Sequence, residues 1–198
     1  MRAKSRVPNK AASGNGAATL LLHTRRHGNA VPEPLRWMQS ASLKIDYLGN
    51  QQRFLPVLVN AMFSHWRSLL EAQGKSREDF AESIQARCRI GSLPTALVAF
   101  EGDMVLGTAA LKTQDLDIRS HLTPWLGGVF VLPEHRGHGV ASLLVTRCVA
   151  EARELGFSEL YLWTPSSESL YARHGWTVFE RAPYHGLQIC IMHRRLPS

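Results

Sequence analysis

The stretch WLGGVFVLPEHRGHGVASLLVTRCVAEAREL, residues 125–155, decides the fold of this chain. It begins with an apolar run, residues 125–132, which has the length of a buried strand and ends at Pro133. After a short polar turn, apolar residues recur at spacings of three or four and fall on one helical face: Val140, Leu144, Cys148, Ala152 and Leu155. The pattern predicts a strand, a glycine-bearing turn and a helix.

A turn of this kind is suited to phosphate. The first N–H groups of a helix have no partner, and the helix dipole is positive at that end. Gly137 and Gly139 let the backbone approach a ligand closely, and Arg136 adds a cation with a forked set of donors. No lysine stands where a Walker loop needs one, and Ser142 replaces the third glycine of a dinucleotide fingerprint. The turn therefore predicts a phosphate site of another kind.

Two motifs carry a resemblance to a known family. The sequence RGHGVA, residues 136–141, resembles the pyrophosphate loop of the GNAT superfamily of acetyl-CoA-dependent N-acetyltransferases. Downstream, SLYARHGW at residues 169–176 looks like the family's LYxxxGF element, with Trp in place of Phe. The motifs occur in the family's order, and the resemblance extends over residues 42–196.

The resemblance implies an α/β (α+β) fold with a GNAT-like mixed, mostly antiparallel central sheet flanked by helices. Hydrophobic patterns agree with the implied order β-α-α-β-β-β-α-β-α-β-β. We expect strands at residues 42–48, 95–100, 104–113, 125–132, 160–163, 176–181 and 187–194. Helices are expected at residues 51–73, 77–89, 140–156 and 165–174, the last capped by Thr164. Gly127 and Gly128 suggest a bulge in their strand.

The positive charge of the chain is concentrated at its start. Residues 1–37 contain seven Arg and Lys residues against one acidic residue, whereas the rest contains 16 basic and 15 acidic residues. We expect residues 1–40 to be a disordered basic extension, with a presequence or a dispensable lead as alternatives. Residues 41–198 are then the GNAT-like acetyltransferase domain. Its near neutrality gives no preference for a charged acceptor.

By the resemblance, the chain moves an acetyl group from acetyl-CoA to a primary amine of a small molecule or peptide, by direct transfer in a ternary complex. The backbone N–H of Val131 would stabilise the oxyanion, and Tyr171 would act as the general acid. The residues implied to bind the cofactor are Phe130, Val131, Arg136, Gly137, His138, Gly139, Val140, Ala141, Ser142, Ser166 and Ser167.

The general base and the acceptor pocket stay open. The strand before the loop carries no titratable residue, so water would take the proton through Asp115, Asp117, His121, Tyr184 or His185, or the amine arrives neutral. For the acceptor pocket we expect Trp66, Asp115, Asp117, Trp125, Tyr184 and His185. The missing base also leaves an alternative, a non-catalytic acyl-CoA-binding sensor or interaction module of the same fold.

The sequence gives little indication of a metal, a membrane or a nucleic acid as a further partner. Three cysteines lie far apart and suit a reducing compartment, so a cytoplasmic location is expected. No metal is expected, because His135 and His138 have no carboxylate or thiol at ligand spacing. No apolar run is long enough for a membrane span. Only the basic first 37 residues would suit nucleic acid, and a dimer is left open.

Overall fold

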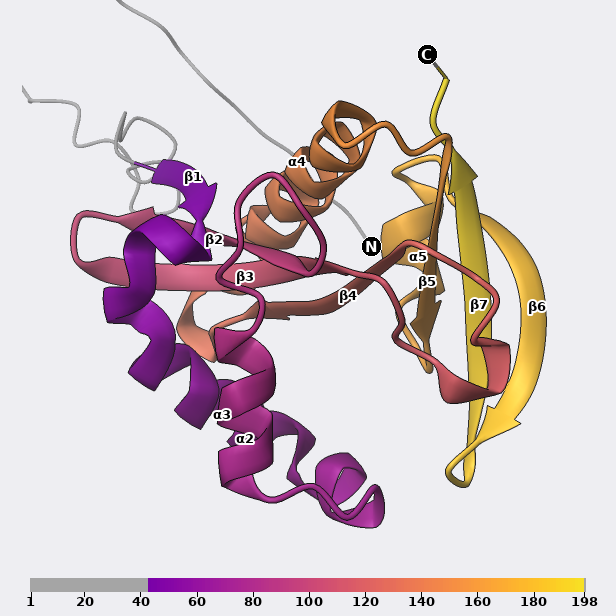
Figure 1. Cartoon of the computed structure of the whole chain (residues 1–198), viewed down its shortest axis with the longest axis horizontal. Helices are drawn as coiled ribbons and strands as arrows, with labels where there is room; N and C mark the ends of the chain where they lie inside the picture. Colours follow the sequence, from indigo (N-terminus) through magenta and orange to yellow (C-terminus); the bar gives the residue numbers. More distant parts are fainter. Residues whose placement is uncertain (1–42, 198) are drawn as a thin grey trace, which may run out of the picture. The chain divides into compact units, whose positions relative to one another are not determined.

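The computed structural model describes residues 43–197. The expected boundary near residue 40 lies outside the described residues. Within that range, seven strands form one sheet (Figure 1): β1 (Leu43–Tyr47), β2 (Thr95–Glu101), β3 (Met104–Lys112), β4 (Trp125–Val131), β5 (Glu159–Thr164), β6 (Thr177–Tyr184) and β7 (Leu187–Arg195). Their order across the sheet is β1-β2-β3-β4-β5-β7-β6, and only the β4–β5 pair is parallel.

The helices are α2 (Leu55–Ala72), α3 (Arg77–Gln85), α4 (Val140–Glu154) and α5 (Glu168–Ala172). Three 3-10 turns lie between these strands and helices: η2 (Leu48–Phe54) between β1 and α2, η3 (Asp117–Arg119) between β3 and β4, and η4 (Pro133–His135) between β4 and α4. The order of helices and strands is the expected one. The predicted mixed, mostly antiparallel sheet flanked by helices is confirmed.

Alternating residues of β2 decide which helices cover which face of the sheet. Leu97 and Ala99 belong to the hydrophobic core beneath α4, whereas Ala96, Val98 and Phe100 belong to the core beneath α2 and α3. Figure 1 shows α4 on one side of β2, β3 and β4, with α2 and α3 on the other. Such period-two alternation is what a strand buried on both faces requires. The sheet is therefore the middle of three layers.

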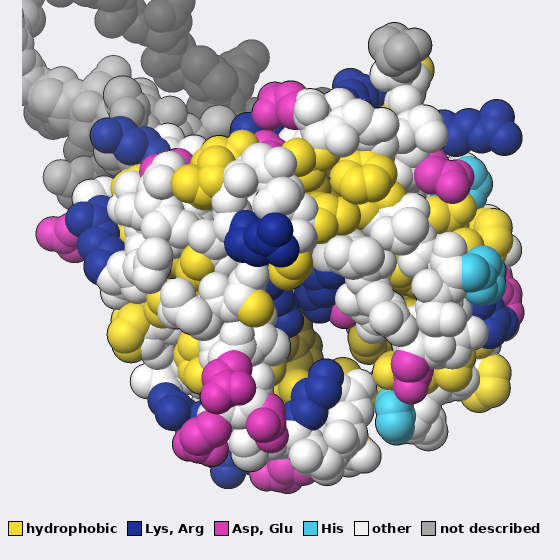
Figure 2. Space-filling model, viewed as in Figure 1, with side chains coloured by type: hydrophobic (Ala, Val, Ile, Leu, Met, Phe, Trp, Pro, Cys, Tyr) yellow, Lys and Arg dark blue, Asp and Glu magenta, His cyan; other side chains and the backbone are white. Residues whose placement is uncertain are grey.

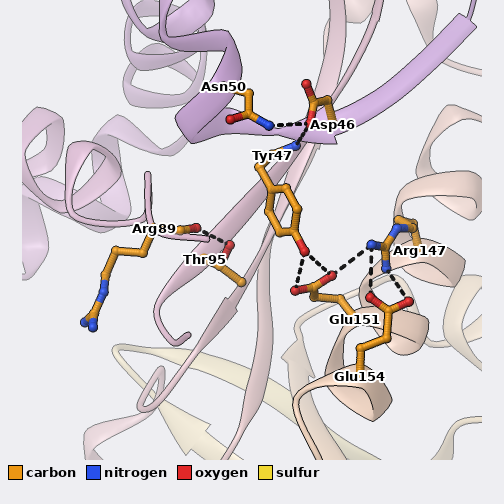
Figure 3. A network of polar contacts seen from close by, with 8 residues as sticks. All are labelled: Asp46, Tyr47, Asn50, Arg89, Thr95, Arg147, Glu151 and Glu154. Atoms are coloured by element: carbon orange, nitrogen blue, oxygen red, sulfur yellow. Dashed lines mark hydrogen bonds and ion pairs between the residues drawn. The ribbon is translucent and has the colours of Figure 1, made fainter. Parts of the chain in front are cut away.

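A polar network ties the edge strand β1 to α4 (Figure 3). The hydroxyl of Tyr47 donates to both carboxylate oxygens of Glu151 at 2.9 Å. Arg147, one turn earlier on α4, pairs with Glu151 at 2.9 Å and with Glu154 at 3.3 Å. The Glu151 side chain is 1% exposed. Its charge is buried, but it is both paired and hydrogen-bonded, as a buried carboxylate must be.

Two helices differ from their predicted bounds at the start. The predicted helix over residues 51–73 begins as η2, and α2 starts only at Leu55. Pro56 stands in the first turn of α2, where its missing N–H costs nothing. Thr164 belongs to β5, and its hydroxyl accepts from the N–H groups of Ser166 and Ser167. The predicted cap thus closes a turn, and α5 begins later, at Glu168.

One helix is shorter than predicted at its end. The capping box between Ser76 and Asp79 is present, as predicted, but α3 stops at Gln85 instead of residue 89. Cys88 then forms a bridge with Thr95, and the N–H of Ala96 donates to the carbonyl of Arg87. These contacts with β2 take the backbone groups that a longer helix would use. Residues 86–89 therefore lead the chain into the sheet.

Candidate active site

The parallel strands β4 and β5 separate soon after they begin. Their register contains one partner pair, Trp125 with Tyr161, and the N–H of Tyr161 donates to the carbonyl of Pro124 at 3.0 Å. From there β5 continues in register with β7, as far as Thr164 opposite Cys190. Among the described strands, none pairs with β4 on its β5 side beyond Trp125. The two strands therefore diverge, and an opening is left between them.

Backbone groups at the end of β4 face this opening. The N–H of Leu132 donates to the carbonyl of Leu106 in β3 at 3.0 Å. Because peptide groups along a strand alternate in direction, the N–H of Val131 points away from β3, toward the open side. The carbonyl of Val131 accepts a hydrogen bond from Nε of Arg136 at 3.0 Å. The same alternation directs the N–H of Phe130 toward β3, so of these two residues only Val131 turns its N–H to the open side.

The turn that follows β4 leaves the N-terminus of α4 without a side-chain cap. Gly137 and Gly139 have φ angles of 80° and 81°, and a Cβ at either position would meet nothing within 4 Å. The glycines are thus needed for backbone conformation and not for space. Arg136, anchored on Val131 through Nε, adds a cation beside the helix end. An uncapped helix N-terminus with a neighbouring cation fits an anionic group such as a diphosphate.

A cleft with a volume of 910 Å³ lies between two sides of the molecule. Helices α2 and α3 form one side, and the β6–β7 hairpin forms the other. Figure 2 shows a hollow on this face, with basic side chains inside it. Its walls combine α2, the segment after β3, the middle of β4, the end of β5, and α5. Lining residues include His65, Trp66, Arg87, Lys112, Asp115, Asp117, Gly127, Gly128, Val129, Ser166, Ser167, Tyr171, Tyr184 and His185.

Tyr171 lies on α5 and lines the cleft, although its side chain is only 8% exposed. Its ring packs edge-on against Trp176 at a centroid distance of 6.2 Å. The N–H of Trp176 donates to the Tyr171 carbonyl, which folds the SLYARHGW segment back on itself. Burial, followed by the negative charge of Asp115, raises the pKa of the Tyr171 phenol to about 12. The phenol is therefore a proton donor throughout the neutral range.

A cluster of charged side chains covers the bulge in β4. Nζ of Lys112 lies 2.5 Å from Oδ1 of Asp115, and each side chain is 15% exposed. A Cβ at Gly127 would lie 2.3 Å from Oδ2 of Asp115, and a Cβ at Gly128 would lie 3.3 Å from NH1 of Arg87. The register of β3 shifts opposite this point, and Gly128 has a φ of 61°, which confirms the expected bulge. Glycine here makes room for charges beside the open strand.

Most residues that were expected to bind the acceptor lie around the cleft. Trp66, Asp115, Asp117, Tyr184 and His185 all line it. Trp125 does not: it is fully buried, and its indole N–H donates to the carbonyl of Leu122 at 2.6 Å. That expectation was wrong, because the ring packs against Tyr161 at the point where β4 and β5 are still paired.

Four charged or titratable lining residues were missed: His65, Lys75, Arg87 and Lys112. Lys112 and Asp115 stand three residues apart, at the end of a strand that is otherwise apolar, and this pair was a usable signal. The expected cofactor residues divide between two places. Ser166 and Ser167 line the cleft, whereas the loop at residues 136–142 lies outside its lining, at the other end of β4.

Comparison with known proteins agrees with the fold and the site described above. The family model described as the acetyltransferase (GNAT) family matches residues 60–176, which include β4, the glycine turn, α4 and Tyr171. The chain belongs to the GNAT acetyltransferase family. No curated protein sequence matches the chain. The predicted family resemblance is confirmed.

Solved structures of GNAT acetyltransferases share the fold. A Salmonella typhimurium protein described as an acetyltransferase, solved with its cofactor acetyl-CoA, is 20% identical and has a TM-score of 0.61, covering 79% of this chain and 95% of its own. A protein described as a phosphinothricin N-acetyltransferase is 20% identical, with a TM-score of 0.60 and coverage of 79% and 100%. An aminoglycoside 6'-acetyltransferase is 16% identical, with a TM-score of 0.62 and coverage of 78% and 98%.

No helix in residues 43–197 is long and apolar enough to cross a membrane. In the same range, no three His, Cys, Asp or Glu side chains gather in a way that could hold a metal ion.

Proposed function

We propose that this GNAT acetyltransferase moves an acetyl group from acetyl-CoA to a primary amine by direct transfer in a ternary complex. The observation that carries the proposal is the opening between β4 and β5, with an uncapped helix N-terminus at one end and the Tyr171 phenol in the adjoining cleft. Family membership supports acetyl-CoA as the donor, and the Salmonella structure is described with it. In this proposal, the groups that bind the cofactor and the proton donor lie around one strand, β4.

The residues present fit the coenzyme. The turn at residues 136–142 offers first-turn N–H groups of α4 and the Arg136 cation to the diphosphate. The open side of β4 at Val131 offers backbone groups to the amide-bearing arm, as a neighbouring strand would. Ser166 and Ser167 lie across the cleft. Bound acetyl-CoA supplies a thioester, whose carbonyl carbon is open to attack and whose sulfur can leave.

The chain's own groups then act on the reaction in two ways. The Val131 N–H donates to the carbonyl oxygen as it gains negative charge, while the amine nitrogen bonds to the carbonyl carbon and the carbon–sulfur bond breaks. Tyr171 gives its hydroxyl proton to the departing thiolate. The amine must lose one proton, and Asp115, Asp117, His65 and His185 line the cleft where that proton leaves.

The direct test uses the purified full-length chain. Calorimetric titration with acetyl-CoA measures binding, and a free-thiol assay with a panel of primary amines measures transfer. We expect acetyl-CoA to bind and thiol to appear only when an accepted amine is present. Failure to bind acetyl-CoA would remove the proposal.

The second candidate is a non-catalytic acyl-CoA-binding module. Its support is that β4, Trp125–Val131, carries no titratable side chain. The amine panel separates the two candidates: a binding module binds acetyl-CoA and releases no thiol with any amine. Acetylated amine, identified by mass spectrometry, would exclude it.

A further inference from the structure

The acceptor half of the cleft contains more positive than negative charge close to the acyl site. Arg87 and Lys112 lie over Gly128 and Gly127, in the strand whose open side faces the proposed thioester. Lys75 also lines the cleft, so three basic side chains face two acidic ones there, Asp115 and Asp117. The described domain is nearly neutral as a whole, and this imbalance is local.

Among residues 43–197, the carboxylate that interacts with the two inner cations is that of Asp115, and it is already engaged. Asp115 holds Lys112 at 2.5 Å, and burial lowers the pKa of the Lys112 ammonium despite that partner. Arg87 has a hydrogen bond from NH2 to Oγ of Ser83 at 3.3 Å, and no ion pair among the described residues. Burial lowers the pKa of Arg87 too, and the charge of Asp115, which is already paired with Lys112, opposes that shift only in part. A half-buried guanidinium that shares its nearest carboxylate with Lys112 is only partly compensated for its desolvation.

A bound anion would supply that partner. Its oxygens would meet the forked donors of Arg87, with Lys112 beside them, at the bulge of β4. This point is three residues from Val131 on the same strand, about 10 Å at 3.3 Å per residue, so an amine held a few bonds from the anion is directed along β4 toward the thioester. A polycationic acceptor would instead have to bring its charges against these two cations.

Building on the proposed function, we propose that the acceptor is a small amine with a nearby anionic group, a carboxylate or a phosphonate, that binds Arg87 and Lys112. The Arg87 guanidinium would be its main anchor, and Lys112 would add a second donor while remaining paired with Asp115. Recognition of the anion orients the amine; the chemical step stays with the groups already assigned to it.

Matched pairs of amines test this in the full-length protein. Free L-amino acids are compared with their C-terminal amides, and β-alanine, γ-aminobutyrate and 2-aminoethylphosphonate with their uncharged analogues. Spermidine serves as the polycationic arm. We expect kcat/KM to be at least about 30-fold higher for the anionic member of the accepted pair. The phosphonate arm shows which anion the site takes. Equal or better use of amides or of spermidine would overturn the inference.

Substitutions at Arg87 test whether its guanidinium causes the preference for anionic amines. Arg87→Gln should reduce the anionic-to-neutral ratio to near one, mainly through KM, with the Kd of acetyl-CoA unchanged. Arg87→Lys should restore part of the ratio, which a loss of folding would not allow. Arg89→Gln is the matched control, since Arg89 is exposed, stands two residues away and is outside the cleft lining. An unchanged ratio in Arg87→Gln would overturn the inference.

Three further outcomes distinguish failure of this inference from failure of the proposed function. If the protein binds acetyl-CoA and acetylates neutral amines alone, the transferase proposal stands and the anionic acceptor is wrong. If it binds acetyl-CoA but acetylates no anionic amine in the panel, the inference is likewise overturned. If acetyl-CoA does not bind at all, both proposals fall.

Discussion

The ammonium group of Lys112 lies 2.5 Å from Oδ1 of Asp115, and the other carboxylate oxygen leaves no space for a Cβ at Gly127. The Lys112–Asp115 ion pair therefore requires glycine at residue 127, because any Cβ there would overlap the carboxylate. Lys112 pairs with Trp125 in the β3–β4 register, and Trp125 precedes Gly127 by two residues. This arrangement brings a buried pair of charges against the strand on which the reaction is proposed to take place.

Gly127→Ala should fold but lose most transferase activity, because the new Cβ displaces the Asp115 carboxylate and breaks its pair with Lys112. The loss should be at least about 10-fold in kcat/KM. In an Asp115→Ala background the same change should cost much less, because the space is then free. A double-mutant cycle measures the coupling. Additive effects of the two substitutions would contradict the contact.

Tyr171→Phe should lower kcat by about 100-fold or more, as expected when a general acid is removed, with little change in the Kd of acetyl-CoA. Tyr161→Phe is the matched control. The Tyr161 phenol is also buried and its pKa is also raised to about 12, but it is outside the cleft lining. An unchanged kcat in Tyr171→Phe would show that another group protonates the sulfur.

The pH dependence provides a second check on Tyr171. Because its pKa is raised from 10 to about 12, the phenol stays protonated through pH 10. Its contribution to stability is complete below pH 10 and is lost as the pH rises toward about 12. The kcat profile of the wild-type protein should therefore show no fall from phenol ionisation between pH 7 and about 10.

Gly139→Ala should weaken acetyl-CoA binding by at least about 10-fold, because a Cβ disfavours the left-handed conformation that starts α4. Gly156→Ala is its matched control at the other end of the same helix. Both glycines have similar φ angles, 81° and 85°, and open space around the Cβ position. Both variants should lose about 1–2 kcal/mol of unfolding free energy. Titration calorimetry should distinguish them: equal acetyl-CoA affinity would exclude a role for the α4 N-terminus in binding.

Glu151→Gln should destabilise the domain by about 2 kcal/mol, since it removes a buried charge that Tyr47 and Arg147 both bind. Glu154→Gln should change stability by less than about 0.5 kcal/mol, because that carboxylate is 60% exposed. Urea unfolding of both variants measures the difference. Equal midpoints would show that the link between β1 and α4 in Figure 3 adds nothing to stability.

The sequence predicted the features that are determined by residues close to one another along the chain. The spacing of Val140, Leu144 and Cys148 predicted α4, and the glycines before it predicted an open turn, because both patterns are local. The order of strands followed from apolar runs and turn residues. Tyr171 was recognised from its short motif, and the structure places it in the lining of the cleft as a buried residue.

What could not be predicted depends on contacts across the sheet. Arg87 was expected in a helix, but bonds with β2 end that helix early and leave its side chain in the cleft. Trp125 was expected beside the acceptor. The alternation of residues along a strand, however, does not show at which end the strand pairs with its neighbour. The near-neutral charge of the domain concealed the imbalance in the cleft, which arises only when Arg87, Lys112 and Asp115 meet over β4.

The most direct test mixes the full-length protein with acetyl-CoA and an accepted amine, and follows free thiol and acetylated amine together. The account predicts one thiol released for each amine acetylated, with no acetyl group on the protein when the amine is omitted. Thiol released without acetylated amine, or an acetyl group transferred first to the protein, would contradict direct transfer in a ternary complex.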